Sequence, residues 1–524
     1  MRSVLRNKVF AFALIALLLA TTLVAGCAKP KTTGQTGTTG GTTAGGPKRG
    51  GTLTVGISGD PITLDPHKSA SMTDRNYYYQ IYDPLVTLGA DGSIQPGLAE
   101  KWDNPDPKTY IFHLRTGVKF HDGTDFNATI AKWNFDRMLD PKAKLPRLSE
   151  INMIDTVTVT DANTLKITLK TPYAPFLTVL TDRSGMMVSK AAVEKLGDDF
   201  ARKPVGTGPF IVTEWTPKSQ VVLRRFDQYW DKPKPYLDGV VYKIIPDETV
   251  RLTSLKTGEV GLIDTIPPKD VASVKASGEY TVAESPSQAY DYLDLNTKQP
   301  PFNNKALRQA VAWAIDRQAI QQTVYYNVGA VANSPFPASL WAHDPNFVPY
   351  TRDVAKAKAA MAAGGQPNGF SFKLTMTNTP LNVLVGQVIQ GQLKEVGIDM
   401  QLDLVDSSAL SAALTSGKYQ ACRAGWSGRA DPDGNVYTMF TTNGSINYRK
   451  LSNKTLDDLL EKARAATTQA ERKTLYQQAA QIIADESVLV FIHSDQFLHP
   501  MKKNVKGYKM ISDGRIRLAG VWLE

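Results

Sequence analysis

The pattern in residues 383–404 constrains the fold more than any other part of the chain. Apolar residues recur at helical spacing along one side of its first half, namely Val385, Val388, Ile389, Leu393 and Val396. Gly397 follows at once, and a glycine just past the last turn commonly ends a helix because it takes a left-handed conformation without strain. Residues 398–404 then alternate apolar and polar side chains, as a half-buried strand does. A helix that leads through a glycine into a strand indicates helices packed on a sheet, so we expect an α/β protein.

Other segments add further strands and helices to this expectation. Thr52–Ile57 and Tyr110–Leu114 alternate as strands, and the apolar run Val488–Ile492 is typical of a strand that is covered on both faces. Helices are expected in four further places: over Tyr77–Leu88, after the capping residue Asn127, over Pro301–Ile320 and, as a pair, over Leu456–Ala484.

The first 26 residues indicate export from the cytoplasm. Basic residues precede the apolar run Val9–Ala20, which is too short to span a bilayer and is typical of a secretory signal peptide. The residues Leu23–Gly26 before Cys27 resemble a bacterial lipobox, in which the cysteine is acylated and becomes the new N-terminus. We expect residues 1–26 to be a lipoprotein signal peptide and Cys27 to carry the lipid. An ordinary signal peptide with an incidental cysteine is the alternative.

The segment after Cys27 is expected to act as a tether. Thr32–Gly46 contains only Thr, Gly, one Gln and one Ala, and no core can be built from such residues. Residues 27–49 are therefore predicted to be the lipidated cysteine followed by a disordered Thr/Gly-rich stretch. This arrangement would hold the remaining chain at the cell membrane, outside the cytoplasm, on either a periplasmic or an extracellular face.

Composition sets broad limits on partners and stability. The chain has 524 residues, of which 42% are hydrophobic and 21% charged, as in soluble proteins of more than one domain. The net charge of +10 is spread along the chain without a basic run beyond the signal region, so no nucleic-acid partner is expected. If Cys27 is lipidated, Cys422 has no disulfide partner, and we expect it to be a buried apolar residue.

No catalytic, metal or cofactor site is predicted. The sequence lacks the HExxH and CxxC patterns, a GxSxG elbow and a phosphate-loop lysine, and its six histidines are scattered. No nucleophile and base can be paired from it, so we do not expect an enzyme. A secreted hydrolase that uses two carboxylates is the alternative, and turnover of a substrate would reveal it.

Five segments resemble, in order and spacing, the extracellular solute-binding proteins of family 5, the peptide- and nickel-type receptors of ABC importers. These segments are Leu98–Leu139, Pro204–Trp230, Asp247–Asp264, the stretch from Tyr290 to Ile320, and Cys422–Tyr448. Each motif alone is weak, but the ordered set is specific and extends the resemblance from about Gly50 to the C-terminus.

This resemblance implies a two-lobed α/β fold of the periplasmic-binding-protein type (type II, cluster C), with an extra third domain and a hinge. Lobe I would comprise residues 50–86, 201–293 and 491–524, the extra domain residues 87–200, and lobe II residues 294–490. A ligand that contacts both lobes only in the closed form would favour closure, and the transporter could then distinguish loaded from empty receptor.

Cys422–Tyr448 is the expected wall of the ligand site. It combines turn-forming Gly, Asp and Asn with large aromatic residues, which suits a pocket, although a surface turn with aromatics tucked into the core is an equal alternative. Family relatives carry an Asp three places after the tryptophan, where this chain has Arg429. Asp431 could replace that carboxylate against a ligand amine, or could simply stabilise the turn that runs to Gly434.

A second departure concerns the ligand carboxylate. Dipeptide receptors of the family hold it with an Arg after the strand that ends near Met376, and Thr375–Leu381 contains none. Arg429 could bind an anion from the other side, or the ligand could be longer. The residues expected by position to contact ligand are Ser71, Met72, Thr73, Trp426, Arg429, Asp431, Asn435, Asn447 and Tyr448.

Together these features predict a monomeric receptor that captures di- or oligopeptides between two lobes and delivers them to the permease and ATPase subunits of an ABC importer. It would need no cofactor and would meet the membrane through its lipid. An oligosaccharide or nickel-chelate receptor of the same family is the first alternative, although no histidine lies in residues 422–448. A surface chaperone or sensor is a further class, since fold does not fix function.

Overall fold

The computed structural model describes residues 46–69 and 71–524. The predicted signal peptide, Cys27 and nearly all of the tether lie outside the described residues.

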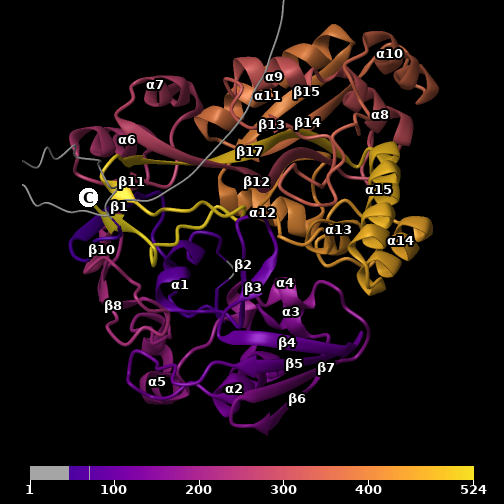
Figure 1. Cartoon of the computed structure of the whole chain (residues 1–524). Helices are drawn as coiled ribbons and strands as arrows, with labels where there is room; N and C mark the ends of the chain where they lie inside the picture. The colour runs from indigo at the N-terminus through magenta and orange to yellow at the C-terminus, as the bar shows by residue number, and fades with distance from the viewer. Residues whose placement is uncertain (1–45, 70) are drawn as a thin grey trace, which may run out of the picture. The chain divides into compact units, whose positions relative to one another are not determined.

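The largest sheet has eleven strands and joins segments that are far apart in the sequence (Figure 1). Its order is β15-β14-β16-β12-β17-β11-β1-β10-β9-β8, with β13 paired to β17. The strands are β1 (Thr52–Ile57), β8 (Phe210–Thr216), β9 (Gln220–Arg225), β10 (Gly239–Ile244), β11 (Leu262–Ile263), β12 (Tyr280–Leu295), β13 (Ala330–Val331), β14 (Phe370–Thr377), β15 (Ile398–Val405), β16 (Ala421–Trp426) and β17 (Leu489–Lys502). Parallel pairs such as β1–β10 and β14–β15 stand on either side of the antiparallel pair β12–β17, so the sheet is mixed.

The pair β12–β17 connects two hydrophobic cores. Near one end, Leu498 packs with Leu252 and Val274, whereas at the other end Leu293 and Val490 belong to the core of the later half of the chain. Between these ends the register is interrupted, first between residues 286 and 290 and again between 291 and 292. Two long strands therefore run from one core into another and carry an irregular segment between them.

A further core lies under β1, β10 and the buried helix α1 (Arg75–Ile81). The sequence predicted a longer helix over Tyr77–Leu88, and this was wrong at its C-terminal end. Tyr82 is already extended, and the chain enters β2 (Val86–Leu88) instead. The physical reason is Pro84, because a proline disfavours helical geometry in the residue before it. The helices α6 (Glu248–Thr257) and α7 (Val271–Ala276) complete this half of the sheet.

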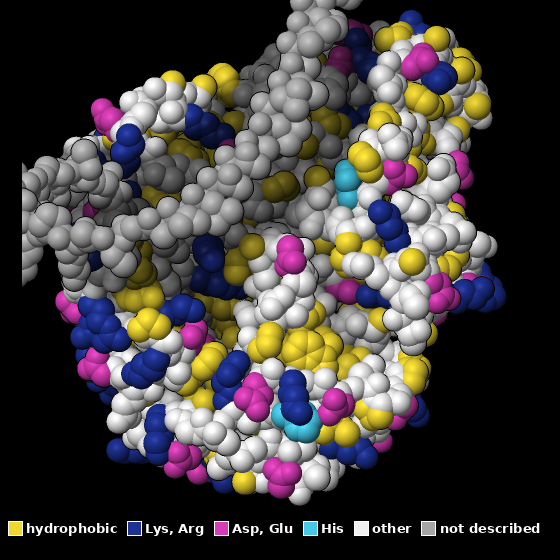
Figure 2. Space-filling view, in the orientation of Figure 1, with side chains coloured by type: hydrophobic (Ala, Val, Ile, Leu, Met, Phe, Trp, Pro, Cys, Tyr) yellow, Lys and Arg dark blue, Asp and Glu magenta, His cyan; other side chains and the backbone are white. Residues whose placement is uncertain are grey.

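A four-stranded antiparallel sheet has a core of its own. Its order is β4-β5-β7-β6, and its strands are β4 (Ala99–Asp106), β5 (Thr109–Leu114), β6 (Ile154–Asp161) and β7 (Thr164–Leu169). Helix α2 (Ala128–Leu139) packs on it, and the predicted cap is confirmed because the side chain of Asn127 accepts a hydrogen bond from Ile130 N. The short elements beside it are β3 (Ile94–Pro96), α3 (Leu148–Ile151), α4 (Phe176–Val179) and α5 (Lys190–Leu196). On the face seen in Figure 2, basic and acidic side chains alternate over this region without a basic stripe.

The later half of the chain confirms the predicted helix–glycine–strand unit. Helix α11 (Pro380–Glu395) ends before Gly397, whose φ is +95°, and β15 begins at Ile398. The predicted helix over Pro301–Ile320 is instead two helices, because Ile315 is extended and Asp316 caps a new start. The helices of this half are α8 (Lys305–Ala314), α9 (Arg317–Thr323), α10 (Val354–Ala363), α12 (Ser407–Ser416), α13 (Asp433–Phe440), α14 (Lys454–Ala465) and α15 (Gln469–Glu486). The chain ends with the small pair β18 (Val505–Lys506) and β19 (Trp522–Leu523), and none of the helices described here is long and apolar enough to cross a bilayer.

Candidate ligand-binding site

The predicted ligand segment, residues 422–448, begins on the strand that flanks the register break. β16 pairs with β12, and Trp426 lies opposite Tyr290. The chain then turns at Gly428, whose φ is +72°. A Cβ atom at this position would lie 2.2 Å from the carbonyl oxygen of Gln288. The turn is therefore packed directly on the interrupted part of β12, where only glycine fits.

Asn435 fixes the shape of this turn. Its fully buried side chain accepts hydrogen bonds from Trp426 Nε1 at 2.7 Å and from Arg429 N at 3.0 Å, and donates to Arg429 O at 3.1 Å. The guanidinium of Arg429 lies over the Trp426 ring, 4.9 Å from its centroid. Three of the predicted residues are thus brought together. Asn435 and the polar atom of Trp426 shape the turn, and the guanidinium of Arg429 donates to neutral groups of the same turn, Ser427 Oγ and Gly428 O.

Asp431 has protein partners on both carboxylate oxygens. It accepts from Arg472 Nη1 at 2.9 Å and Nη2 at 2.6 Å, and from the backbone N–H of Asp433 at 2.9 Å. Only 6% of Asp431 is exposed. The neighbouring Asp433 is held in the same way by Arg464, at 3.0 and 2.8 Å. These contacts are those of a turn closed by buried ion pairs, and a contact between Asp431 and a ligand amine stays a prediction.

Asn447 and Tyr448 lie at the far end of the segment. The buried amide of Asn447 donates to Thr441 O at 3.0 Å and to Leu451 O at 2.7 Å, and its oxygen accepts from Leu451 N at 3.0 Å. Tyr448 is half-buried. The side chain of Asn447 thus holds a loop together.

A cavity of about 320 Å³ lies beside the middle of β12–β17. One wall comes from the N-terminal half and the C-terminus and includes Met72, Thr73 and Arg515, and the other includes Tyr325, Leu381 and His493. Met72 is 44% exposed although it is a large apolar side chain. Two predicted contact residues, Met72 and Thr73, therefore line a cavity to which both halves of the sheet contribute, while Ser71 stands directly beside them in the chain.

The wall formed by Tyr325 and His493 is a flat stack. The two rings are 3.6 Å apart and 6° from parallel. The stack is held in place because Arg423 donates to Tyr325 Oη at 3.0 Å and to Asp291 at 2.7 Å. His493 in turn shares a hydrogen bond of 2.8 Å with Gln321. Because only 3% of Tyr325 and 2% of His493 is exposed, the stack supports the cavity wall from behind and offers a ligand little more than the edges of its rings.

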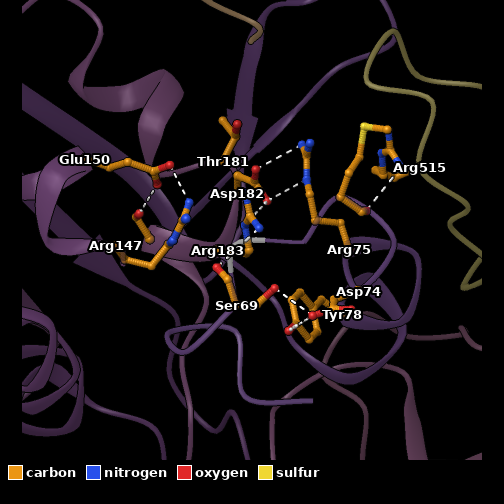
Figure 3. A network of polar contacts seen from close by, with 12 residues as sticks. Ser69, Asp74, Arg75, Tyr78, Arg147, Glu150, Thr181, Asp182, Arg183 and Arg515 are labelled. Carbon is orange, nitrogen blue, oxygen red and sulfur yellow. Dashed lines mark hydrogen bonds and ion pairs between the residues drawn. The ribbon is translucent and has the colours of Figure 1, made fainter. Parts of the chain in front are cut away.

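A cluster of charged residues borders the cavity near Ser69–Thr73 (Figure 3). Figure 3 shows the side chains of Arg75 and Arg183 beside Asp182, that of Arg147 beside Glu150, and that of Arg515 on the far side of Arg75. Arg183 donates to the backbone oxygen of Ser71 at 2.9 Å. Arg429 joins the cluster electrostatically, because Glu150 is the charge that acts on it most. Arginines of this cluster thus act both on the predicted contact residues Ser71 and Met72 and on Arg429 of the predicted ligand segment.

Sequence reasoning missed Arg183, Arg515 and Tyr325. Lys and Arg make up 60 residues of the chain, and no local pattern separates Arg183 or Arg515 from those on the surface. His493 could have been found, because it directly follows the predicted apolar strand Val488–Ile492 and belongs to the same observed strand, β17. The buried, free thiol of Cys422 agrees with its prediction, and burial raises its pKa. No group of metal-ligating side chains occurs in residues 46–69 or 71–524.

Comparison with known proteins gives the chain its family. The model of "Bacterial extracellular solute-binding proteins, family 5 Middle" matches residues 93–448. The glutathione-binding protein GsiB of Shigella dysenteriae is 31% identical over 476 residues, which are 88% of this chain and 92% of that protein.

Two solved structures extend the similarity to the fold. The periplasmic binding protein DppA from Helicobacter pylori, in complex with the peptide STSA, has a TM-score of 0.81 and 30% identity, covering 91% of this chain and 99% of that one. AgaA from A. tumefaciens R10, in complex with agropinic acid, has a TM-score of 0.79 and 32% identity, covering 90% and 99%. The expected two-lobed α/β fold is confirmed, and the chain belongs to family 5 of the bacterial extracellular solute-binding proteins.

Proposed function

We propose that this chain is the peptide-binding receptor of an ABC importer and that it holds its ligand in the cavity between Met72–Thr73 and the Tyr325–His493 stack. The observation that carries the proposal is the position of this cavity, which has walls from both halves of the sheet beside the register break of β12. Similar proteins are described as binding glutathione or the peptide STSA, both of which are short peptides.

Closure of two lobes is the proposed mechanism. Lobe I is assigned to residues 50–86, 201–293 and 491–524, the extra domain to 87–200, and lobe II to 294–490. The separate hydrophobic cores support this division, and the irregular pairing around residues 286–290 supplies a place where two long strands can bend. A ligand that touches both walls gains its full contacts only when they approach, so its binding favours the closed form.

The proposed receptor binds its ligand without changing it chemically. Its family consists of binding proteins, and the buried histidines described here have structural partners: His67 bonds Met186 O at 3.0 Å and His121 bonds Gly208 O at 2.9 Å. We therefore expect every bound peptide to be recovered intact. Appearance of cleaved peptide over hours would instead support the hydrolase alternative.

Lipid attachment at Cys27 and residence outside the cytoplasm complete the proposal. We expect the full chain to fractionate with membranes and Cys27→Ser to be released into the soluble fraction. Radiolabelled palmitate should be incorporated only by the parent. Equal labelling of the two proteins would exclude Cys27 as the acylated residue.

Identification of the natural ligand tests the function directly. Native mass spectrometry of protein purified from its own host should show a co-purified mass, and tandem fragmentation should yield peptide backbone ions. Titration calorimetry with glutathione and with the tetrapeptide Ser-Thr-Ser-Ala should then show saturable binding of at least one of them. A saccharide or a nickel chelate as the only co-purified species would contradict the peptide assignment.

A further inference from the structure

The charged cluster beside the cavity contains more arginines than carboxylates. Six arginines act on one another there, namely Arg75, Arg147, Arg183, Arg429, Arg515 and Arg517. Three carboxylates face them, namely Glu150, Asp182 and Asp513, and a fourth buried carboxylate, Asp74, lies in the same network beside Ser69 and Tyr78. Because uncompensated charge is costly to remove from water, the excess of two positive charges needs an explanation.

Three of the arginines each have a carboxylate of their own. Arg75 meets Asp182 through Nε at 3.2 Å and Nη2 at 3.0 Å. Arg517 meets Asp513 through two bonds of 2.8 and 2.7 Å. The third pair is formed by Arg147 and Glu150, and Glu150 also accepts from Ser184 Oγ at 2.6 Å. These pairs use up three of the four carboxylates, and the fourth, Asp74, accepts from Ser69 Oγ, Tyr78 Oη and the backbone N–H of Ile62 and forms no ion pair with an arginine.

Arg183 and Arg515 form hydrogen bonds only to neutral groups. Arg183 donates to Ser71 O at 2.9 Å and to Ser69 O at 3.4 Å, and its nearest approach to Asp182 is 3.9 Å. Arg515 donates to the backbone oxygen of Asp513 at 2.9 Å and to that of Met72 at 3.4 Å. Only 3% of Arg183 and 5% of Arg515 is exposed, so little water reaches them in place of a counter-ion.

Arg429 is the third arginine without a paired carboxylate. It donates to Ser427 Oγ at 3.2 Å and to Gly428 O at 2.7 Å. It reaches the cluster from the ligand segment, whereas Arg183 follows α4 and Arg515 lies near the C-terminus. Arg183 and Arg515 thus donate to the adjacent carbonyls of Ser71 and Met72. Arg429 lies within electrostatic reach of Arg183 and Glu150, so three distant parts of the chain contribute one uncompensated arginine each.

The other buried arginines among the described residues do have partners that compensate their charge or satisfy their donors. Five of them face a carboxylate one to one: Arg251 with Asp264, Arg308 with Glu486, Arg423 with Asp291, Arg449 with Asp294, and Arg472 with Asp431. Arg317 has no such partner, but four backbone carbonyls accept from it. The positive excess is therefore particular to the cluster beside the cavity.

Within the cluster, the pKa values separate the three unpaired arginines from Arg75 and Arg517, whose pKa values are raised by their carboxylates. Burial lowers the pKa of Arg183, and it lowers the pKa of Arg429 and of Arg515 to about 10. The charge of Arg75 adds to the fall in all three. For Arg75 itself, burial acts in the same direction but is outweighed by Asp182, so that its pKa is raised. Charge on the three unpaired arginines is thus the least favoured in the cluster.

We propose that Arg183, Arg429 and Arg515 form an anion-binding subsite, and that the receptor selects peptides carrying an acidic side chain. The guanidinium group suits this task because its planar N–H donors match a carboxylate in a bidentate manner. The subsite lies next to the proposed cavity, since Arg515 lines it and Arg183 holds the loop that carries Met72. This inference rests on the proposed function and specifies its ligand class.

A matched pair of tripeptides tests the subsite in the unaltered protein. Titration calorimetry at low salt should show that Ala-Glu-Ala binds at least about tenfold more tightly than Ala-Gln-Ala, which has the same shape without the charge. Equal affinities would overturn the subsite and leave peptide binding intact. Binding of tricarballylate, a small tricarboxylate, without binding of any peptide would support the anion subsite and overturn the peptide function. Failure of all three probes to bind would overturn both.

Three substitutions locate the effect. Arg183→Gln, Arg429→Gln and Arg515→Gln should each bring the affinity ratio of the two tripeptides close to one. Arg224→Gln, which removes an exposed charge from β9, should leave the ratio unchanged. Because a buried charge without a partner is lost, the ligand-free Arg183→Gln and Arg515→Gln proteins should melt at the same or a higher temperature than the parent. A preserved ratio in all three variants, or lower melting temperatures for both buried ones, would overturn the proposal.

Discussion

Asp431 illustrates how one partner decides the role of a residue. The sequence offered two interpretations, a ligand contact or a turn, and could not show that Arg472 would lie on both oxygens of this carboxylate. A buried ion pair is costly to break, because the remaining charge then has no partner. Loss of the Asp431–Arg472 ion pair should therefore appear as a lower free energy of unfolding.

We predict that Asp431→Asn lowers the free energy of unfolding by about 3–5 kcal/mol. Urea denaturation followed by circular dichroism measures the change. Asp458→Asn serves as the control, since the ion pair of Asp458 with Lys454 is on the surface and its loss should not be detectable. Unchanged stability together with weakened peptide binding would instead favour a contact between Asp431 and a ligand amine.

Gly434 offers a way to move Arg429 without replacing it. A Cβ atom at Gly434 would lie 2.5 Å from Cγ and 2.6 Å from Cβ of Arg429. We predict that Gly434→Ala displaces this side chain together with its backbone, weakens binding of the acidic tripeptide several-fold and lowers the free energy of unfolding by about 1–3 kcal/mol, because the clash lies close to the backbone of the turn. Gly391→Ala, at an exposed helix position with open space around it, should leave tripeptide binding unchanged and raise the free energy of unfolding by about 1 kcal/mol. Tight binding by the Gly434 variant would show that Arg429 is not needed in its present position.

The elements of the fold were largely predictable where the signal is local. The helix–glycine–strand unit around Gly397, the cap at Asn127 and the strand over Thr52–Ile57 need only neighbouring residues, and the structure confirms each of them. The cavity was not predictable to the same degree. Its walls meet through pairing between β12 and β17, whose residues are separated by some 200 positions, and no local pattern encodes that register.

The turn at Gly428 is an element in which packing and backbone conformation can be separated. Gly428→Ala would place a Cβ atom 2.2 Å from Gln288 O, besides forcing alanine into a positive φ. We predict a loss of more than about 2 kcal/mol in unfolding free energy. The matched variant Gly417→Ala has a similar φ of +69° and open space, and should lose only about 1 kcal/mol. Equal losses in the two proteins would show that the turn does not press on β12.

At the scale of the whole molecule, buried histidines link stability to pH. Burial lowers the pKa to about 4 for His67 and His121 and to about 3 for His499. A histidine in the unfolded chain titrates near 6.5, so between about pH 6.5 and 4 the unfolded chain binds more protons than the folded one. Acidification through this window therefore favours unfolding. Asp83 acts in the opposite direction, because burial raises its pKa to about 6.

We predict that, between pH 6.5 and pH 4, the His499→Gln protein loses about 3 kcal/mol less unfolding free energy than the parent does. The measurement is the free energy of unfolding of parent and variant at several pH values, and the difference between the two proteins cancels the contribution of Asp83. If both proteins lose stability in parallel, His499 is protonated in the folded state and the assigned direction of its pKa is wrong.

The uncompensated arginines have a consequence for the transport cycle. Three guanidinium groups converge from distant parts of the chain, so bringing the lobes together without cargo would gather positive charges that repel one another. An acidic peptide supplies the missing counter-charge at the moment of closing. The empty receptor would therefore rarely reach the closed form that docks on the transporter. The transporter would then seldom hydrolyse ATP without a peptide to import.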